Sequence, residues 1–282
     1  MSKFYLENEY NDRIDLQNDD LYCIATDTSG WGVAKSSNYI AIGDHFVRNY
    51  LKTNQNEFSM VLNFVQPRAF DKLQTVSNFI LKAAKLYLIY VPDLTNAGEY
   101  RRDVDVVSFM KTGGVDGLLR YTLKLKAKSL FYDKHQTKFY VDRTDGEFRF
   151  DFRWDFRFND YANREMILTN NGHVDAGFSF EIYGYSDKPR VSLFQNNQLI
   201  KEITCNCEVL EGEKVEYCSL DGNLYVNHVD VNGVKTSLYN TFDLSDDIFF
   251  KIPAGDVQVK FTSESGTMNQ IYFTLFKFYE VV

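Results

Sequence analysis

Apolar and polar residues alternate along most of the chain, which predicts a series of short β-strands. The alternation is most regular in residues 118–130. Its apolar side holds Tyr121, Leu123, Leu125 and Ala127. Its polar side includes Lys124, Lys126 and Lys128. Because side chains alternate between the faces of a strand, we expect these lysines to face solvent and to discourage edge pairing, rather than to form a binding patch.

A second regular stretch, residues 148–158, reads FRFDFRWDFRF. All its aromatic side chains fall on one face, and the arginines and aspartates of 149–157 fall on the other. The pattern predicts a long strand whose aromatic face covers a neighbouring sheet. An exposed aromatic rail that stacks on sugars is the alternative. We expect the charged face to contribute to an inter-domain or inter-subunit sheet.

The period changes in residues 68–86, where apolar residues recur every three or four positions. This spacing predicts one amphipathic helix whose apolar face packs on a core. Short strands are expected on either side of it. They are residues 4–6, 13–16, 31–33, 39–43, 58–65, 87–91 and 100–110, the last with Val107 and Phe109 out of phase with Val104 and Val106. Gly113, Gly114 and Gly117 are expected to form the turn that follows.

Past residue 161, turn signals rich in Gly, Asn and Asp recur every 8–15 residues or so. Short strands are expected between them. They are residues 178–183, 190–194, 199–203, 214–219, 224–229, 249–252, 257–261 and 271–282. This spacing is typical of a β-sandwich or barrel.

Composition supports a mainly β chain of two domains. The chain has 282 residues, of which 16% are aromatic, and aromatic residues favour strands. The formal net charge of −8 argues against a general nucleic-acid binder. Residues 1–138 carry 18 basic and 16 acidic side chains, whereas residues 139–282 carry 13 and 23. This shift suggests a domain boundary near residue 138.

The N-terminus does not resemble a signal peptide, and no apolar run is long enough to span a bilayer. Four cysteines do not suggest a disulfide framework in a chain of this length. We therefore expect a soluble protein that is synthesised in a reducing cytoplasm.

Residues that could carry chemistry are few. None of the four histidines (His45, His135, His173 and His228) has a second ligand at zinc spacing. Cys205 and Cys207, with Cys218, could bind a soft metal, although small buried residues are the favoured interpretation. The Asp19-Asp20 and Asp246-Asp247 pairs do not fit an EF-hand loop. No nucleotide-binding or hydrolase motif occurs. The sequence therefore predicts no catalytic, cofactor-binding or metal-binding residue and no enzyme activity.

Several segments, taken in order, resemble one family. The opening FYLENEYNDRIDL is followed by DKLQTVSNFILKAAKLYLIYVP, EYRRDVDVVSFMKTGG and LLRYTLKLKAKSLFYDK. This order resembles the N-terminal domain of distal tail proteins (Dit) from long-tailed, non-contractile phages of Gram-positive hosts. Tyr100 to Val104 is similar to the family's Y-x-R-x-V strand. The chain departs from the family at Lys111-Thr112-Gly113, and it has Leu130-Phe131-Tyr132 where a Trp-Tyr pair is common.

The second half is similar to the galectin-like sandwich of the same family. The shared features are Asn170-Asn171-Gly172, Gly184, the Asp187-Lys188-Pro189 turn and Gly212-Glu213. The resemblance thus implies a mainly β chain with an α+β N-terminal domain. It also implies that residues 1–138 form a tail-tube-like, ring-forming split β-barrel with one helix, and that residues 139–282 form a galectin-like β-sandwich.

The resemblance implies a structural virion protein at the tail tip or baseplate. Six copies would form a ring, or stacked rings, joining the major tail-tube protein to the tail-associated hub protein. The C-terminal sandwich would dock receptor-binding or peripheral baseplate proteins. DNA would pass through the channel only as cargo, and no membrane partner or cofactor is implied.

Two other functions remain open. One is a carbohydrate-binding module that adheres to cell-wall saccharides, for which Tyr183, Tyr185, Tyr225 and Tyr239 could serve. The other is a cell-wall hydrolase, which requires a paired acid or metal site that the sequence does not reveal.

Overall fold

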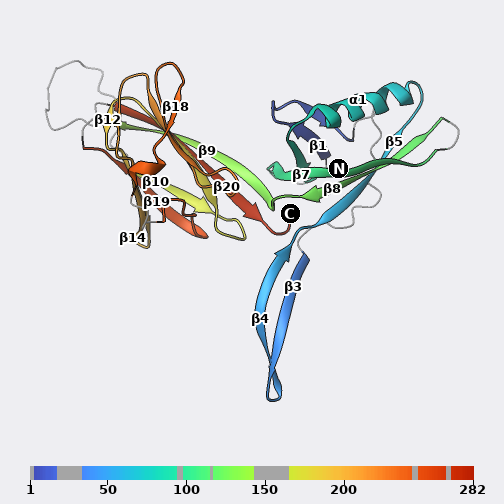
Figure 1. Ribbon diagram of the computed structural model, residues 1–282, viewed down its shortest axis with the longest axis horizontal. Helices are drawn as coiled ribbons and strands as arrows, with labels where there is room; N and C mark the ends of the chain where they lie inside the picture. The colour runs from blue at the N-terminus through green and yellow to red at the C-terminus, as the bar shows by residue number, and fades with distance from the viewer. Residues whose placement is uncertain are drawn as a thin grey trace, which may run out of the picture. The chain divides into compact units, whose positions relative to one another are not determined.

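The computed structural model describes residues 3–17, 34–93, 98–114, 117–142, 165–242, 247–264 and 268–282. The chain divides into two compact units. The N-terminal unit contains residues 1–133 together with 278–282, and the C-terminal unit contains residues 134–277. Strands predominate in both units, and one α-helix occurs among the described residues (Figure 1). The prediction of a mainly β chain is therefore confirmed.

The N-terminal unit is built on an antiparallel sheet in the order β2-β1-β6-β7-β8-β5. Its elements are β1 (Lys3–Asn8), β2 (Arg13–Asp15), β3 (Ala34–Ile42), β4 (His45–Asn54), β5 (Glu57–Phe64), α1 (Ala69–Lys82), β6 (Leu86–Val91), β7 (Tyr100–Gly113) and β8 (Leu119–Ala127). β3 and β4 form a separate two-stranded sheet. β9 (Phe131–Asp142) begins in this unit, at a bridge between Tyr132 and Arg101.

The predicted face of β8 is confirmed. Leu123, Leu125 and Ala127 are buried in the core of the unit, and Lys124 and Lys128 are exposed. The phase change in β7 has a local cause, because a bulge between Val106 and Ser108 inserts Val107 as an extra residue. The bulge leaves Val107 half-exposed and returns Phe109 to the core side.

Helix α1 contributes Ala69, Leu73 and Val76 to the same core. The predicted end at residue 86 was wrong. The helix ends at Lys82, because Ala83 has extended backbone angles and Leu86 is the first residue of β6. The apolar spacing continues past the helix only because that strand is also buried at its first position.

The C-terminal unit is a sandwich of two antiparallel sheets. One has the order β18-β17-β16-β11-β20-β9, and the other has the order β10-β19-β13-β14. The bounds are β10 (Glu165–Asn170), β11 (Gly177–Tyr183), β12 (Ser186–Asp187), β13 (Arg190–Gln195), β14 (Gln198–Thr204), β15 (Glu208–Val209), β16 (Lys214–Cys218), β17 (Tyr225–Val229), β18 (Lys235–Ser237), the 3₁₀-helix η1 (Tyr239–Thr241), β19 (Gly255–Thr262) and β20 (Met268–Tyr279). β12 and β15 form a small separate pair.

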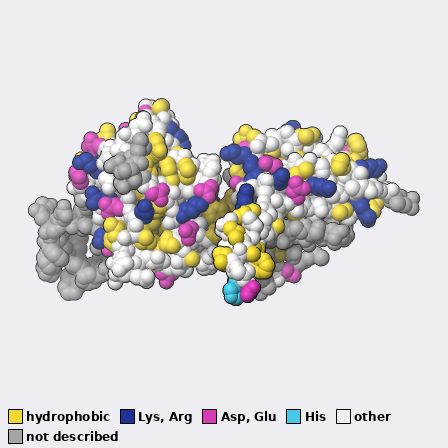
Figure 2. Space-filling view, turned by 60° about the horizontal axis from the view of Figure 1, so that its bottom comes forward, with side chains coloured by type: hydrophobic (Ala, Val, Ile, Leu, Met, Phe, Trp, Pro, Cys, Tyr) yellow, Lys and Arg dark blue, Asp and Glu magenta, His cyan; other side chains and the backbone are white. Residues whose placement is uncertain are grey.

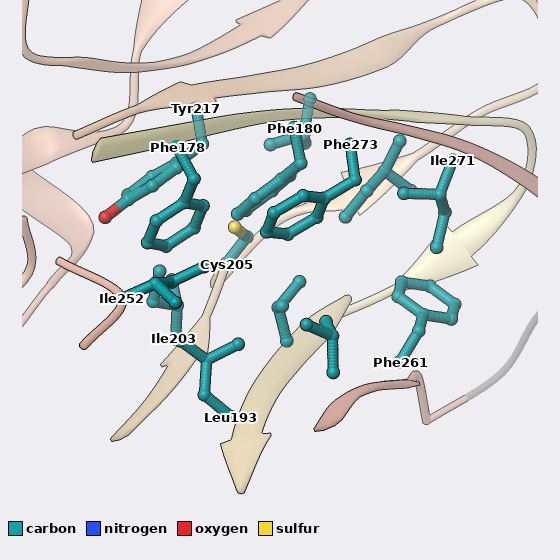
Figure 3. Close-up of a cluster of buried hydrophobic side chains, with 14 of the residues drawn as sticks. Phe178, Phe180, Leu193, Ile203, Cys205, Tyr217, Ile252, Phe261, Ile271 and Phe273 are labelled. Atoms are coloured by element: carbon teal, nitrogen blue, oxygen red, sulfur yellow. The ribbon is translucent and has the colours of Figure 1, made fainter. Parts of the chain in front are cut away.

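Both sheets contribute to one aromatic core (Figure 3). Phe178 stacks against Phe273 with ring centroids 5.2 Å apart, and Phe180 stacks against Tyr217 at 4.7 Å. Phe261 faces these rings from the opposite sheet. Alternating strand positions from both sheets thus bury their large side chains against one another.

Some expected strands differ from those observed. Residues 249–252 do not form a strand, and Ile252 alone forms a bridge, with Ala176. Phe250 and Ile252 are nevertheless buried, which accounts for the apolar pattern. Six observed strands were not predicted: β4, β9, β10, β12, β15 and β18. The aromatic stretch 148–158 and residues 31–33 lie outside the described residues.

Candidate functional site

The hairpin of β3 and β4 is the most unusual surface of the N-terminal unit. The two strands pair with each other over nine registered positions, and no third strand from the described residues joins them (Figure 1). All but one of their residues are exposed. A two-residue turn joins the strands, in which Gly43 takes the positive φ that tight hairpin turns require.

This hairpin carries large apolar side chains on both faces. Partners across the strands share a face, and successive residues alternate. One face therefore carries Ile40, Ile42, Val47 and Tyr50, and the other carries Tyr39, Phe46 and Leu51. Phe46 is 76% exposed and Ile42 is 62% exposed. Figure 2 shows hydrophobic side chains gathered along the hairpin. A contiguous apolar surface of this kind marks an interaction site.

The base of the hairpin is anchored to its unit. The Ala34 backbone N–H donates to Asn56 Oδ1 at 3.3 Å, and the Asn56 carbonyl accepts a bond from the Ala127 N–H at 2.9 Å. Lys35 Nζ pairs with Glu280 Oε2 at 2.7 Å. The hairpin is therefore fixed at its base, whereas the rest of β3 and β4 is exposed. It forms an arm that is positioned for a partner.

In the C-terminal unit, one sheet face carries a polar and aromatic pocket of about 310 Å³. It is lined by Gln136, Glu181, Tyr183, Gln270 and Tyr272. The Tyr183 hydroxyl donates to Glu181 Oε2 at 2.6 Å and accepts from Lys214 Nζ at 3.2 Å. Burial, and then the bond to Glu181, raise the pKa of Tyr183. Sequence reasoning singled out Tyr183 but missed Tyr272, whose ring contacts it edge-on at 5.6 Å.

The four tyrosines suggested for sugar binding do not form one cluster. Tyr183 and Tyr225 lie on the same sheet face, but β16 separates their strands. Tyr239 lies in η1 and stacks on Phe249 at a centroid distance of 6.2 Å.

A buried carboxylate lies on the same sheet face. The Glu216 side chain is 8% exposed and pairs with Lys214 Nζ at 2.6 Å and with Lys235 Nζ at 2.7 Å. Burial alone would raise the pKa of Glu216, but the two ammonium groups outweigh it and lower that pKa. The charge is therefore fully paired within the unit.

The three cysteines that the structure describes occupy positions typical of small buried residues, and Cys23 lies outside the described residues. Cys205 is buried in the sandwich core, Cys218 is buried on β16, and Cys207 is partly buried. Burial raises the pKa of all three thiols, that of Cys207 to about 11. Cys205 and Cys207 lie between β14 and β15, outside the strands. Within the described ranges, no group of three or more His, Cys, Asp or Glu side chains could hold a metal ion.

The remaining sequence candidates are dispersed. Asp19, Asp20 and Asp246 lie outside the described residues. His228 contacts Glu213, with Nε2 and Oε2 2.9 Å apart. Across the parts of the chain that the structure covers, no helix has the length and apolar character required to cross a membrane.

Comparison with known families gives a match over the first part of the chain. Residues 3–128 match the model of the distal tail protein, N-terminal domain. No curated protein sequence matches the chain significantly.

Solved structures share the fold over the whole chain. A chain of the phage P2 baseplate in its activated conformation with calcium is 11% identical, with a TM-score of 0.69 and complete coverage of both chains. The strontium form of that baseplate gives the same TM-score at 12% identity. The SPP1 Dit protein is 12% identical, with a TM-score of 0.59 and coverage of 96% of this chain and 98% of that one. At these identities the likeness concerns the fold.

Proposed function

From the match of residues 3–128 to the model of the distal tail protein N-terminal domain, we propose that the protein forms a ring at the distal end of a phage tail. In this proposal six copies join the tail-tube protein to the hub protein of the baseplate. The protein is then a structural component of the virion. The ring-forming domain is residues 1–138, and the galectin-like domain is residues 139–282.

The single observation that carries the proposal is the β3–β4 hairpin. Seven large apolar side chains lie exposed on its two faces, and a two-stranded ribbon with both faces in water is at best marginally stable on its own. Closed rings bury such surfaces by placing the same element of each copy against the next copy. We therefore assign the hairpin to the contact between neighbouring copies.

The C-terminal domain is the proposed docking platform for receptor-binding or peripheral baseplate proteins. Residues 139–282 carry 13 basic and 23 acidic side chains, so their surface favours partners with basic patches. DNA passes through the ring as cargo, without base recognition.

Light scattering after size exclusion tests the ring directly. We expect a mass near six times 32.9 kDa, or twice that for stacked rings, at a sufficient protein concentration. A monomer that persists when purified tail-tube protein is added would contradict the proposal.

The carbohydrate-binding alternative has no support from the matched family. The tyrosines suggested for it are dispersed, although Tyr183 and Tyr272 share a pocket. A pull-down with host cell-wall polysaccharide tests this role. Binding that is lost in the Tyr272→Ala variant would support it.

A further inference from the structure

Arg102 is a buried cation in the core of the N-terminal unit. It lies on the inner face of β7, in phase with buried Val104, and is 3% exposed. Its guanidinium carbon is 4.9 Å from the ring centroid of Phe131 and 5.8 Å from that of Phe58. Nε donates to the Ser129 carbonyl at 2.8 Å. The side chain is therefore held in place by two rings and one hydrogen bond.

No carboxylate among the described residues lies within ion-pair distance of Arg102. The nearby acids have other partners. Asp103 accepts a bond from the Tyr132 hydroxyl at 2.9 Å, and Asp105 pairs with Lys128 at 3.2 Å. The adjacent Arg101, by contrast, pairs with Glu7 at 2.5 Å. Burial lowers the pKa of Arg102 to about 10, so that the side chain remains charged at neutral pH.

A pocket of about 300 Å³ adjoins this cation. It is lined by Thr53, Asn54, Gln55, Arg102, Ala127, Lys128, Ser129 and Leu130. Since water takes about 30 Å³ per molecule in the liquid, this space holds roughly ten waters or a small organic anion. Among the described residues, neither Nη atom of Arg102 has an acceptor. The Ser129 hydroxyl oxygen accepts the Asp103 N–H at 2.9 Å, which leaves its own proton available to donate.

We propose that this pocket binds a carboxylate group through the two Nη atoms of Arg102. A guanidinium presents parallel donors that match the two oxygens of a carboxylate. The ligand is a monoanion because Lys128, the second cation of the pocket, is already paired with Asp105. A buried cation without a counter-charge lowers stability, and binding of the carboxylate supplies that counter-charge.

The carboxylate can come from a small free acid or from an Asp or Glu side chain of a second copy of this chain. The second source rests on the proposed function. It is supported by the position of the pocket, because Thr53 and Asn54 end β4 and lie at the base of the apolar hairpin. A side chain that enters there would fix the register of the contact between copies.

Acetate titration of the full-length chain, labelled with ¹⁵N at arginine, tests the site. We expect acetate to shift the Arg102 Nε and Nη signals, at constant ionic strength with chloride. Arg102→Met keeps the apolar stem but removes these signals, so the acetate affinity of wild type and variants is compared by isothermal titration calorimetry. The substitution should weaken acetate binding about tenfold or more. Arg120→Met is the matched control, since Arg120 donates to Asn63 Oδ1 in the same unit, and it should leave affinity within about twofold.

Arg102→Lys keeps the charge but loses the parallel donors of the guanidinium. This variant is used instead of Arg102→Met if Arg102→Met misfolds. An intermediate affinity of the Lys variant supports the assignment. Equal acetate affinity in the wild-type and Arg102 variants overturns it.

The mass of the assembly distinguishes the two sources. If the carboxylate belongs to a second copy, acetate competes with it, and both acetate and Arg102→Met lower the assembled mass while Arg120→Met does not. If the acid is free, acetate binds and the assembled mass is unchanged. A chain that remains monomeric but binds acetate through Arg102 refutes the ring and retains the site. No acetate binding, together with no effect of Arg102→Met on assembly, refutes the site.

Discussion

The two units satisfy their own side chains to different degrees. The C-terminal unit closes an aromatic core between two sheets and pairs its buried Glu216 with two lysines. The N-terminal unit leaves an apolar hairpin uncovered and buries Arg102 without a carboxylate among the described residues. The C-terminal unit also has exposed apolar residues, but they are spread over several strands and turns.

This difference between the units suggests that one is built mainly for its own stability and the other for assembly. A unit that satisfies its own groups is expected to resist unfolding without help, and its surface is free for docking. A unit with an uncovered apolar arm and a buried cation would gain stability from a partner that covers the arm and from a ligand that neutralises the cation. The uncovered hairpin and the buried Arg102 are thus the best guide to where a partner or a ligand binds.

The largest effect is expected in the closed core. Phe178 is fully buried and contacts four aromatic rings. Phe178→Ala should lower the free energy of unfolding of the C-terminal unit by about 3–5 kcal/mol. Urea unfolding followed by circular dichroism measures this loss. Exposed Ile167 is the control, and Ile167→Ala should change stability by about 0.5 kcal/mol or less. Similar losses in the two variants would refute a self-sufficient sandwich.

Substitutions in the hairpin should weaken assembly and leave the stability of the chain nearly unchanged. Ile42→Ser with Phe46→Ser removes one exposed apolar side chain from each face. We expect the dissociation constant of the assembly to rise about tenfold or more, because this burial is lost on association. The unfolding free energy of the dissociated chain should stay within about 0.5 kcal/mol per site. Light scattering over a concentration series measures the first quantity. An unchanged assembly would remove the hairpin from the interface.

The ion pairs of Glu216 should produce a smaller, pH-dependent effect. Its pKa is lowered in the folded chain, so its contribution is present above the unfolded pKa of about 4.3 and is lost as the pH falls through the folded pKa. Glu216→Gln should therefore lose about 1 kcal/mol at pH 7, and the difference from wild type should disappear at low pH. Unfolding curves between pH 2 and pH 7 or so test this. A constant difference across that range would contradict the assignment.

Thiol reactivity gives the smallest effect. Because burial raises the pKa of Cys207 to about 11, its reaction with a disulfide reagent at pH 8 should be at least about tenfold slower than that of a free thiol. Cys205 and Cys218 should react only after unfolding. Single Cys→Ser variants identify each rate. Fast reaction of Cys205 in the folded chain would show that the sandwich opens readily.

Local patterns predicted much of the fold. The alternation in residues 118–130 identified a buried face and a lysine face because one side of β8 packs on the core. The end of α1 was missed because Leu86 continues the helical spacing from a different element. The strand predicted at 249–252 was wrong because its burial arises from the packing of a loop that forms one bridge. The family resemblance is confirmed by the match of residues 3–128.

The functional surfaces were less accessible from the sequence. Residues 45–54 read HFVRNYLKTN, without a regular period, since neither face of β4 packs on a core. Arg102 gave one usable signal, its phase with Val104, but an arginine in an alternating strand is ordinarily solvated. Only the neighbouring elements, which bring Phe58 and Phe131 to it, reveal that it is buried.

The path of the chain has a mechanical consequence. β9 starts in the N-terminal unit and continues past residue 133 into the C-terminal unit, and β20 returns past residue 277. The sandwich is thus tethered by two covalent connections. A pulling force applied to it divides between two extended backbones, each already near its full length and therefore stiff. Tension on the sandwich would then reach the N-terminal unit through both connections.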